Sequence, residues 1–120
     1  MVVLLLPRTA ETEAVLNRRT LALLPAGAAV INAGRGELID DDALLGALDA
    51  GHLSKAVLDV FREEPLPATH PYWTHPNVTV TPHIASVTNP RTAAPVLAEN
   101  LARLRRGEPA GPLVDRRRGY

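Results

Sequence analysis

The sequence contains no cysteine, which excludes both a disulfide framework and a metal site built from thiolates. It is also poor in aromatic residues, at 3 %, and its hydrophobic fraction of 46 % consists mostly of leucine, alanine and valine. In a chain of 120 residues this composition predicts one small domain with a core of helices layered on a sheet. The absence of cysteine fits a reducing compartment, and we expect a cytoplasmic protein.

Net charge and long apolar segments are lacking as well. The 13 basic and 13 acidic residues cancel, whereas binding to nucleic acid needs a strongly basic face. The basic run at residues 116–118 is interpreted as a solvated tail. The apolar run at residues 1–6 is too short for a membrane span or a signal peptide. We therefore expect neither nucleic acid nor a membrane among the partners.

Apolar runs alternate with helical patterns along the chain. Strands are predicted at residues 2–6, 28–32, 55–60 and 78–81, and helices within 9–24, 40–51 and 89–106. The first run is wholly apolar, which is typical of a parallel strand buried on both faces. Because such alternation forms parallel sheets with right-handed crossovers, the pattern predicts an α/β fold. We expect the C-terminal half of a doubly wound, Rossmann-like sheet, followed by a helix and a tail.

Individual residues predict where the helices begin and end. Thr9, which two glutamates follow, resembles a capping residue at a helix start. Asp40 and the aspartates after it predict the start of the second helix, and Gly51 predicts its end. Pro95 lies within the third helical pattern, so that helix either begins near Pro95 or bends there.

Polar side chains follow the predicted strands at the edge where an open α/β sheet binds its ligands. They are Arg35 after the second strand, Asp59, Glu63 and Glu64 at and after the third, and His83 after the fourth. The planar guanidinium of Arg35 suits a carboxylate, and His83 can exchange a proton with a carbonyl oxygen. Either Glu64 or Glu63 would favour the protonated imidazole. With hydride from a nicotinamide, the set suits reduction of a 2-oxo acid.

Each of these residues also has a purely structural interpretation. Arg35 lies between two glycines and is equally consistent with a loop residue that caps a carbonyl. His83 fits a half-buried histidine whose hydrogen bonds are satisfied by the fold, and Asp59 fits a turn cap. Glu63 and Glu64 fit solvated surface residues.

Two further patterns imitate known sites and are interpreted as structural. His70 and His75 each precede a proline, but two histidines without a third ligand are weak evidence for a metal, and no metal site is predicted. Gly34 and Gly36 follow a strand in the manner of a dinucleotide-binding G-x-G-x-x-G loop. Ile39 occupies the third glycine position, so this fingerprint is judged false.

Five short motifs occur along the chain in a fixed order. They are Leu-Pro-Arg-Thr at 6–9, Asn-Ala-Gly-Arg-Gly at 32–36, Leu-Asp-Val-Phe at 58–61, Glu-Pro at 64–65 and Thr-Pro-His at 81–83. In this order and spacing the sequence resembles the D-isomer-specific 2-hydroxyacid dehydrogenases. The closing residues 114–120 resemble the family's glyoxylate/hydroxypyruvate reductase branch. The resemblance covers essentially the whole chain but less than half of a typical family member.

The resemblance implies roles for particular residues. Arg35 maps to the catalytic arginine, His83 to the acid/base histidine and Glu64 to the carboxylate paired with it, while Asp59 matches the acid near the nicotinamide carboxamide. The cofactor-binding positions that it implies are Thr9, Ala33, Gly34, Arg35, Asp59 and His83. The implied cofactor is NADP or NAD, the substrate is a small 2-oxo acid such as glyoxylate or hydroxypyruvate, and a homodimer is a possible assembly.

The same resemblance implies a division of the chain. Residues 1–88 would form the C-terminal half of the NAD(P)-binding domain, and residues 89–120 a crossover helix and a tail that return to a substrate domain, most of which is absent. The family's glycine-rich phosphate loop lies upstream of the matching region. An alternative is therefore a truncated, non-catalytic fragment or binding module without that loop.

Overall fold

The computed structural model describes residues 1–117, and the chain divides into two compact units. The first, Met1–Ala85, contains a sheet, and the second, Ser86–Tyr120, contains one long helix. Within residues 1–117, no helix combines the length and the apolar character needed to cross a bilayer. The sequence-based division after residue 88 assigns functions to the two parts, and that assignment stays a prediction.

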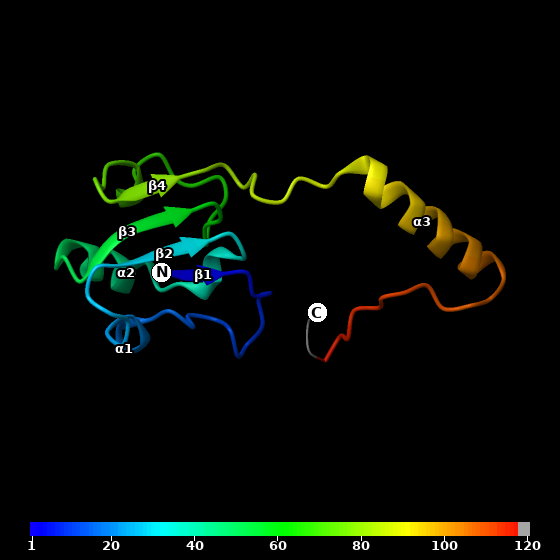
Figure 1. Cartoon of the computed structure of the whole chain (residues 1–120), viewed down its shortest axis with the longest axis horizontal. Helices are drawn as coiled ribbons and strands as arrows, with labels where there is room; N and C mark the ends of the chain where they lie inside the picture. The colour runs from blue at the N-terminus through cyan, green and yellow to red at the C-terminus, as the bar shows by residue number, and fades with distance from the viewer. Residues whose placement is uncertain (118–120) are drawn as a thin grey trace. The chain divides into compact units, whose positions relative to one another are not determined.

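A parallel sheet of four strands organises the first unit (Figure 1). The strands are β1 (Val2–Leu4), β2 (Ala28–Asn32), β3 (Leu53–Leu58) and β4 (Val78–Val80). They lie side by side in sequence order, and each neighbouring pair is parallel. All four carboxyl ends therefore meet at one edge of the sheet. The predicted α/β fold class is confirmed.

Helix α1 (Arg18–Leu21) is short and begins later than the sequence suggests. Its first amides donate to the side chain of Asn17, which caps the helix. The expectation that Thr9 caps a helix is wrong. Its backbone N–H donates to the Thr12 hydroxyl at 2.8 Å, and that hydroxyl donates to the Pro7 carbonyl at 2.7 Å. The Thr12 N–H also donates to the Thr9 hydroxyl at 3.2 Å, so the two threonines cap each other as at a helix start, but the residues that follow form a turn and not a helix.

Helix α2 (Asp41–Asp49) has the ends that the sequence predicts. Asp40 caps it, with its Oδ1 accepting the N–H of Ala43 at 3.0 Å. Gly51 follows the helix with φ of 69°, a left-handed conformation that glycine adopts without a steric penalty. Leu44 on this helix is fully buried in the core. Burial of this apolar side is what holds α2 on the sheet.

Within the first unit, helices cover only one face of the sheet. Consecutive right-handed crossovers in one direction place α1 and α2 on the same face. The side chains of Leu4, Val30, Ala56 and Leu58 are buried. The residues that alternate with these point to the opposite face of the sheet. They form a row of partners across the four strands, namely Val3, Ile31, Val57 and Thr79. Val3 is 47 % exposed, so the expected burial of the first strand on both faces is wrong for this chain.

The proline-rich segment between β3 and β4 contains only a short 3-10 turn, η2 (Pro71–Trp73). Its Tyr72 is buried, and the Tyr72 hydroxyl donates to Asp41 Oδ1 at 2.8 Å. Burial raises the pKa of Asp41 and also that of Tyr72. This bond ties the segment to the start of α2.

Helix α3 (Pro90–Arg105) belongs to the second unit. Asn89 caps it, with its Oδ1 accepting the N–H of Arg91 at 3.0 Å, and Pro90 occupies the first helical position. Pro95 therefore lies inside the helix, which resolves the alternatives left by the sequence. Four apolar side chains of the helix are exposed, Val96, Leu97, Leu101 and Leu104.

The packing of α2 on the sheet leads to a stability prediction. Replacing the fully buried Leu44 with alanine leaves a cavity, and we expect Leu44→Ala to lower the free energy of unfolding by about 2–5 kcal/mol. The control Leu23→Ala removes a leucine that is 76 % exposed and should change it by less than about 0.5 kcal/mol. Urea denaturation followed by circular dichroism measures both. Equal losses in the two variants would contradict this account of the core.

Candidate active site

The end of β2 presents Arg35 on a loop that a buried asparagine organises. Asn32 is 1 % exposed, its Nδ2 donates to the carbonyl of Arg35 at 2.8 Å, and its Oδ1 accepts the N–H of Gly34 at 3.1 Å. The amide thereby satisfies one donor and one acceptor of the loop backbone. The Arg35 side chain is exposed, and its Nη1 donates to the carbonyl of Gly34 at 2.6 Å. Asn32 thus holds the backbone of the loop, while the Arg35 guanidinium faces solvent.

The turn after β4 carries His83 in an unusual backbone conformation. His83 has φ of 53°, which is uncommon for a residue with a side chain. The buried carboxylate of Asp59, at the end of β3, accepts three hydrogen bonds from this turn. They come from the hydroxyl of Thr81 at 2.5 Å, the N–H of Ile84 at 3.0 Å and the N–H of Ala85 at 2.8 Å. Asp59 thus holds the His83 turn in place.

The hydrogen bonds to Asp59 outweigh the cost of its burial. Burial raises the pKa of a carboxyl group, but the bonds from Thr81, Ile84 and Ala85 stabilise the charged form. Their combined effect, with a smaller contribution from His83, holds the pKa of Asp59 below its usual value. The carboxylate is therefore ionised at neutral pH although it is buried.

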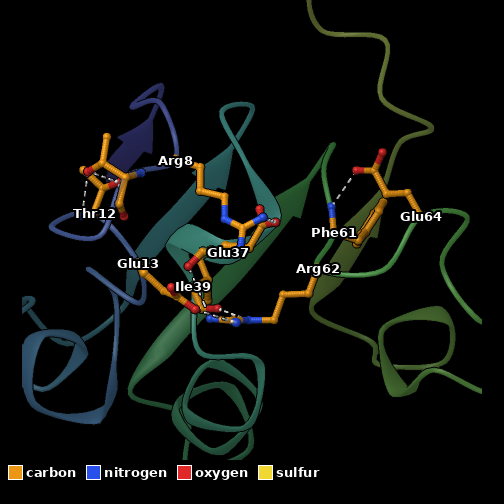
Figure 2. A network of polar contacts seen from close by, with 9 residues as sticks. Arg8, Thr12, Glu13, Glu37, Ile39, Phe61, Arg62 and Glu64 are labelled. Atoms are coloured by element: carbon orange, nitrogen blue, oxygen red, sulfur yellow. Dashed lines mark hydrogen bonds and ion pairs between the residues drawn. The ribbon is translucent and has the colours of Figure 1, made fainter. Parts of the chain in front are cut away.

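Glu64 connects the segment after β3 to the His83 imidazole. Its Oε2 lies 2.8 Å from His83 Nδ1. Its Oε1 accepts the N–H of Phe61 at 2.9 Å, a bond that Figure 2 shows. The hydrogen bond with His83 is the main reason why the pKa of Glu64 lies below its usual value. Of the two candidate glutamates, Glu64 makes this contact, whereas Glu63 is exposed. With Nδ1 engaged, Nε2 is the imidazole nitrogen left for a substrate.

Two cavities adjoin the Glu64–His83 pair. One, of about 230 Å³, is polar and is lined by Arg35, Gly36, Glu37, Phe61, Arg62, Glu64 and His83. The other, of about 250 Å³, is largely apolar and is lined by Phe61, Glu64, Pro65, Leu66, Trp73, Val80, Pro82 and His83. The structure therefore brings Arg35, Glu64 and His83 to one small cavity, from three strand ends that are distant in the sequence.

The expected cofactor positions lie at the same edge of the sheet. Ala33 and Gly34 place no bulky side chain at the end of β2, and their assignment to the cofactor stays a prediction. Packing also requires glycine at position 34, because a Cβ there would lie 2.9 Å from the Leu6 carbonyl oxygen. Thr9 is half-buried, and its hydroxyl lies 3.1 Å from that of Thr12. No G-x-G-x-x-G loop, the usual anchor of a dinucleotide's pyrophosphate, occurs in the sequence.

The remaining histidines of the proline-rich segment have structural contacts. His70 Nδ1 accepts the N–H of Tyr72, and the two rings pack with centroids 4.4 Å apart. His75 Nε2 lies 3.2 Å from Asp49 Oδ1, and its Nδ1 accepts the N–H of Asn77. Within residues 1–117, no group of three or more histidine, aspartate or glutamate side chains is arranged to hold a metal ion.

Sequence reasoning missed the part played by Asn32. The sequence includes it only as the first residue of the Asn-Ala-Gly-Arg-Gly motif, whereas the structure shows that it shapes the loop that presents Arg35. A polar side chain at the buried position of an alternating strand was the available signal, since β2 is otherwise apolar. The three-fold bonding of Asp59 to the His83 turn was likewise not foreseen, because it joins two strand ends.

The depressed pKa of Asp59 predicts how stability depends on pH. A carboxyl group whose pKa is lowered by folding stabilises the protein above its unfolded pKa, and this contribution is lost as the pH falls through the folded pKa. We expect the free energy of unfolding to decrease on acidification below about pH 4. Asp59→Asn should flatten this dependence and cost about 1–3 kcal/mol at pH 7. Urea denaturation between pH 3 and 7 measures both effects.

The control for this prediction is Glu11→Gln, which alters an exposed carboxylate far from the His83 turn in the sequence. Its pH dependence should match that of the unmodified chain. If Asp59→Asn kept the full acid dependence, another group would be responsible for it.

The chain is similar to curated bacterial reductases. Glyoxylate/hydroxypyruvate reductase A of Klebsiella pneumoniae is 50 % identical over 97 % of the chain, and that of Salmonella newport is 48 % identical. The chain spans only 37 % of the length of these curated relatives.

Solved structures lead to the same family. A D-isomer specific 2-hydroxyacid dehydrogenase from Xanthobacter autotrophicus, in complex with NADPH and MES, matches 99 % of the chain at a TM-score of 0.94 and 52 % identity. An NADPH-dependent glyoxylate/hydroxypyruvate reductase from Sinorhizobium meliloti, in complex with NADP and sulfate, matches 98 % at a TM-score of 0.90 and 40 % identity. The chain covers 49 % and 39 % of these two structures. Residues 1–85 match the NAD binding domain of the D-isomer specific 2-hydroxyacid dehydrogenases, and the chain belongs to that family.

Proposed function

We propose that this chain supplies the catalytic half of an oxidoreductase that reduces a small 2-oxo acid, such as glyoxylate or hydroxypyruvate, with NADPH or NADH. The observation that carries the proposal is the single cavity shared by the guanidinium of Arg35, the imidazole of His83 and the carboxylate of Glu64. The names of the relatives support the substrate class, and the NADPH and NADP in the related structures favour NADP over NAD. We place the enzyme in the cytoplasm.

Each residue of the proposed site has a different role in the reaction. Arg35 holds the substrate carboxylate with parallel hydrogen bonds from its planar guanidinium, once that group turns away from the Gly34 carbonyl. His83 Nε2 donates a proton to the carbonyl oxygen as the carbonyl becomes an alcohol, and Glu64 keeps Nδ1 engaged so that Nε2 faces the substrate. The nicotinamide, when bound, supplies the hydride. Asp59 keeps the His83 turn in register with the end of β3.

Activity requires the part of the relatives that this chain does not match. A suitable test protein is a fusion, called the joined enzyme below. It consists of the Klebsiella reductase with this chain in place of the region that the chain matches. In the joined enzyme we expect NADPH-dependent reduction of glyoxylate. His83→Ala should lower kcat by about 10²–10⁴-fold, because the proton donor is lost, while NADPH affinity stays largely unchanged. Absorbance at the NADPH band and fluorescence titration measure the two quantities.

The matched control is His75→Gln, since His75 contacts Asp49 and lies outside both cavities. It should leave kcat unchanged. A joined enzyme that reduces glyoxylate equally well without the His83 imidazole would refute the proposed role of His83.

The second candidate function is a non-catalytic fragment or binding module. The absence of a G-x-G-x-x-G loop from the sequence favours it for the 120-residue chain alone, because such a loop is the main anchor of the pyrophosphate. We therefore expect the chain alone not to bind NADPH in the micromolar range by isothermal calorimetry. Micromolar binding would show that the described residues hold the cofactor without that loop. The homodimer suggested by the resemblance stays a prediction.

A further inference from the structure

Arg62 joins two segments that carry different parts of the proposed site. It lies between Phe61 and Glu64 in the segment after β3, and its side chain reaches back to the 3-10 turn η1 (Gly36–Leu38), which directly follows Arg35 (Figure 2). Arg62 Nε donates to the carbonyl of Ile39 at 2.9 Å, and its Nη2 donates to that of Glu37 at 3.2 Å.

All three guanidinium nitrogens of Arg62 are therefore directed at protein groups. The third, Nη1, lies 3.7 Å from Glu13 Oε1, a partly exposed ion pair that is weak in water. The two bonds to carbonyl oxygens are the stronger contacts, because a charged donor shortens and strengthens a hydrogen bond. Although Arg62 borders the polar cavity, this geometry leaves Arg35 as the guanidinium available to a substrate.

A close backbone contact lies beside these bonds. A Cβ on Gly36 would lie 1.9 Å from the carbonyl carbon of Phe61 and 2.3 Å from the backbone nitrogen of Arg62. Only glycine permits η1 to lie this close to the segment after β3. The backbone of η1 therefore packs directly against the backbone of residues 61–62. The Arg62 guanidinium also bonds to carbonyls within and just after η1.

The same short segment also holds His83. Glu64 accepts the Phe61 N–H with one oxygen and contacts His83 Nδ1 with the other. Residues 61–64 therefore reach the Arg35 loop through Arg62 and the imidazole through Glu64. These four residues therefore link the proposed carboxylate anchor to the proposed proton donor, in addition to the bonds that Asn32 and Asp59 make to each.

We propose that Arg62 is a positioning residue that fixes the Arg35 loop relative to His83, and so determines how tightly the site holds the carboxylate of a 2-oxo acid. The inference rests on the proposed function for its catalytic meaning. Removing the clamp leaves Arg35 on a looser loop, which has to be ordered each time substrate binds. Such a cost weakens the ground state and the transition state alike, so it raises KM and leaves kcat nearly unchanged.

The first test uses the 120-residue chain and amide hydrogen exchange. The N–H groups of Leu38 and Ile39 donate to the carbonyls of Arg35 and Gly36 and report on η1 directly. In Arg62→Ala we expect these two amides to exchange about tenfold faster, whereas the core amide of Val30 keeps its rate. Unchanged exchange at Leu38 and Ile39 would overturn the inference.

The second test uses the joined enzyme with glyoxylate as substrate. We expect Arg62→Ala to raise KM for glyoxylate about tenfold, with kcat within about threefold and KM for NADPH unchanged. Arg62→Lys, which keeps one charged donor, should recover part of the loss. Glu13→Gln removes only the weak ion pair and should behave like the unmodified enzyme, as should Arg19→Ala, a change at an exposed arginine of α1.

The outcomes separate the inference from the function on which it rests. If the unmodified joined enzyme does not reduce glyoxylate, the proposed function fails and the exchange experiment alone decides the clamp. If the enzyme is active but Arg62→Ala leaves KM for glyoxylate unchanged, or lowers kcat and both affinities together, the positioning role is refuted. If Arg62→Ala does not fold, Arg62→Lys gives the same comparison on a milder scale, with Glu13→Gln as its control.

Discussion

The parallel direction of all four strands is the constraint on which the proposed site depends. Parallel strands end at a common edge, so residues that follow β2, β3 and β4 are brought together although dozens of positions separate them in the chain. Arg35, Glu64 and His83 each follow a different strand, and they border one small cavity. An antiparallel arrangement would have sent the middle strand's end to the opposite edge and dispersed them.

Convergence at an edge brings groups near each other, but shorter-range bonds decide their orientation. Asn32 shapes the loop of Arg35 from within the sheet, and Asp59 fixes the turn of His83 through three hydrogen bonds. Both side chains are buried and polar, and the loops that they satisfy would otherwise leave unpaired backbone groups. These hydrogen bonds offset the free-energy cost of burying the two polar side chains. The same bonds orient the loops that carry Arg35 and His83.

The proposed site comprises an arginine, a glutamate and a histidine at one edge of the sheet, and no G-x-G-x-x-G loop occurs in the sequence. The curated relatives are more than twice as long as the chain, which spans 37 % of their length. Within the first unit, helices cover only one face of the parallel sheet, and the row that starts at Val3 faces the other side. Parallel sheets are usually covered on both faces, so this row departs from the usual packing of such a sheet.

The sequence by itself determined the fold class, the ends of α2 and the residue types of the site. These follow from local rules, since apolar periodicity, capping aspartates and a C-terminal glycine act within a few residues. The local pattern gave a wrong prediction at Thr9. The side chains of Thr9 and Thr12 accept each other's backbone N–H, but α1 begins only after Asn17. The choice of Glu64 over Glu63 and the bonds of Asp59 and Arg62 were decided only by tertiary structure. Each of these contacts joins segments 19 to 26 positions apart, and no local pattern specifies which side chain meets which across such a gap.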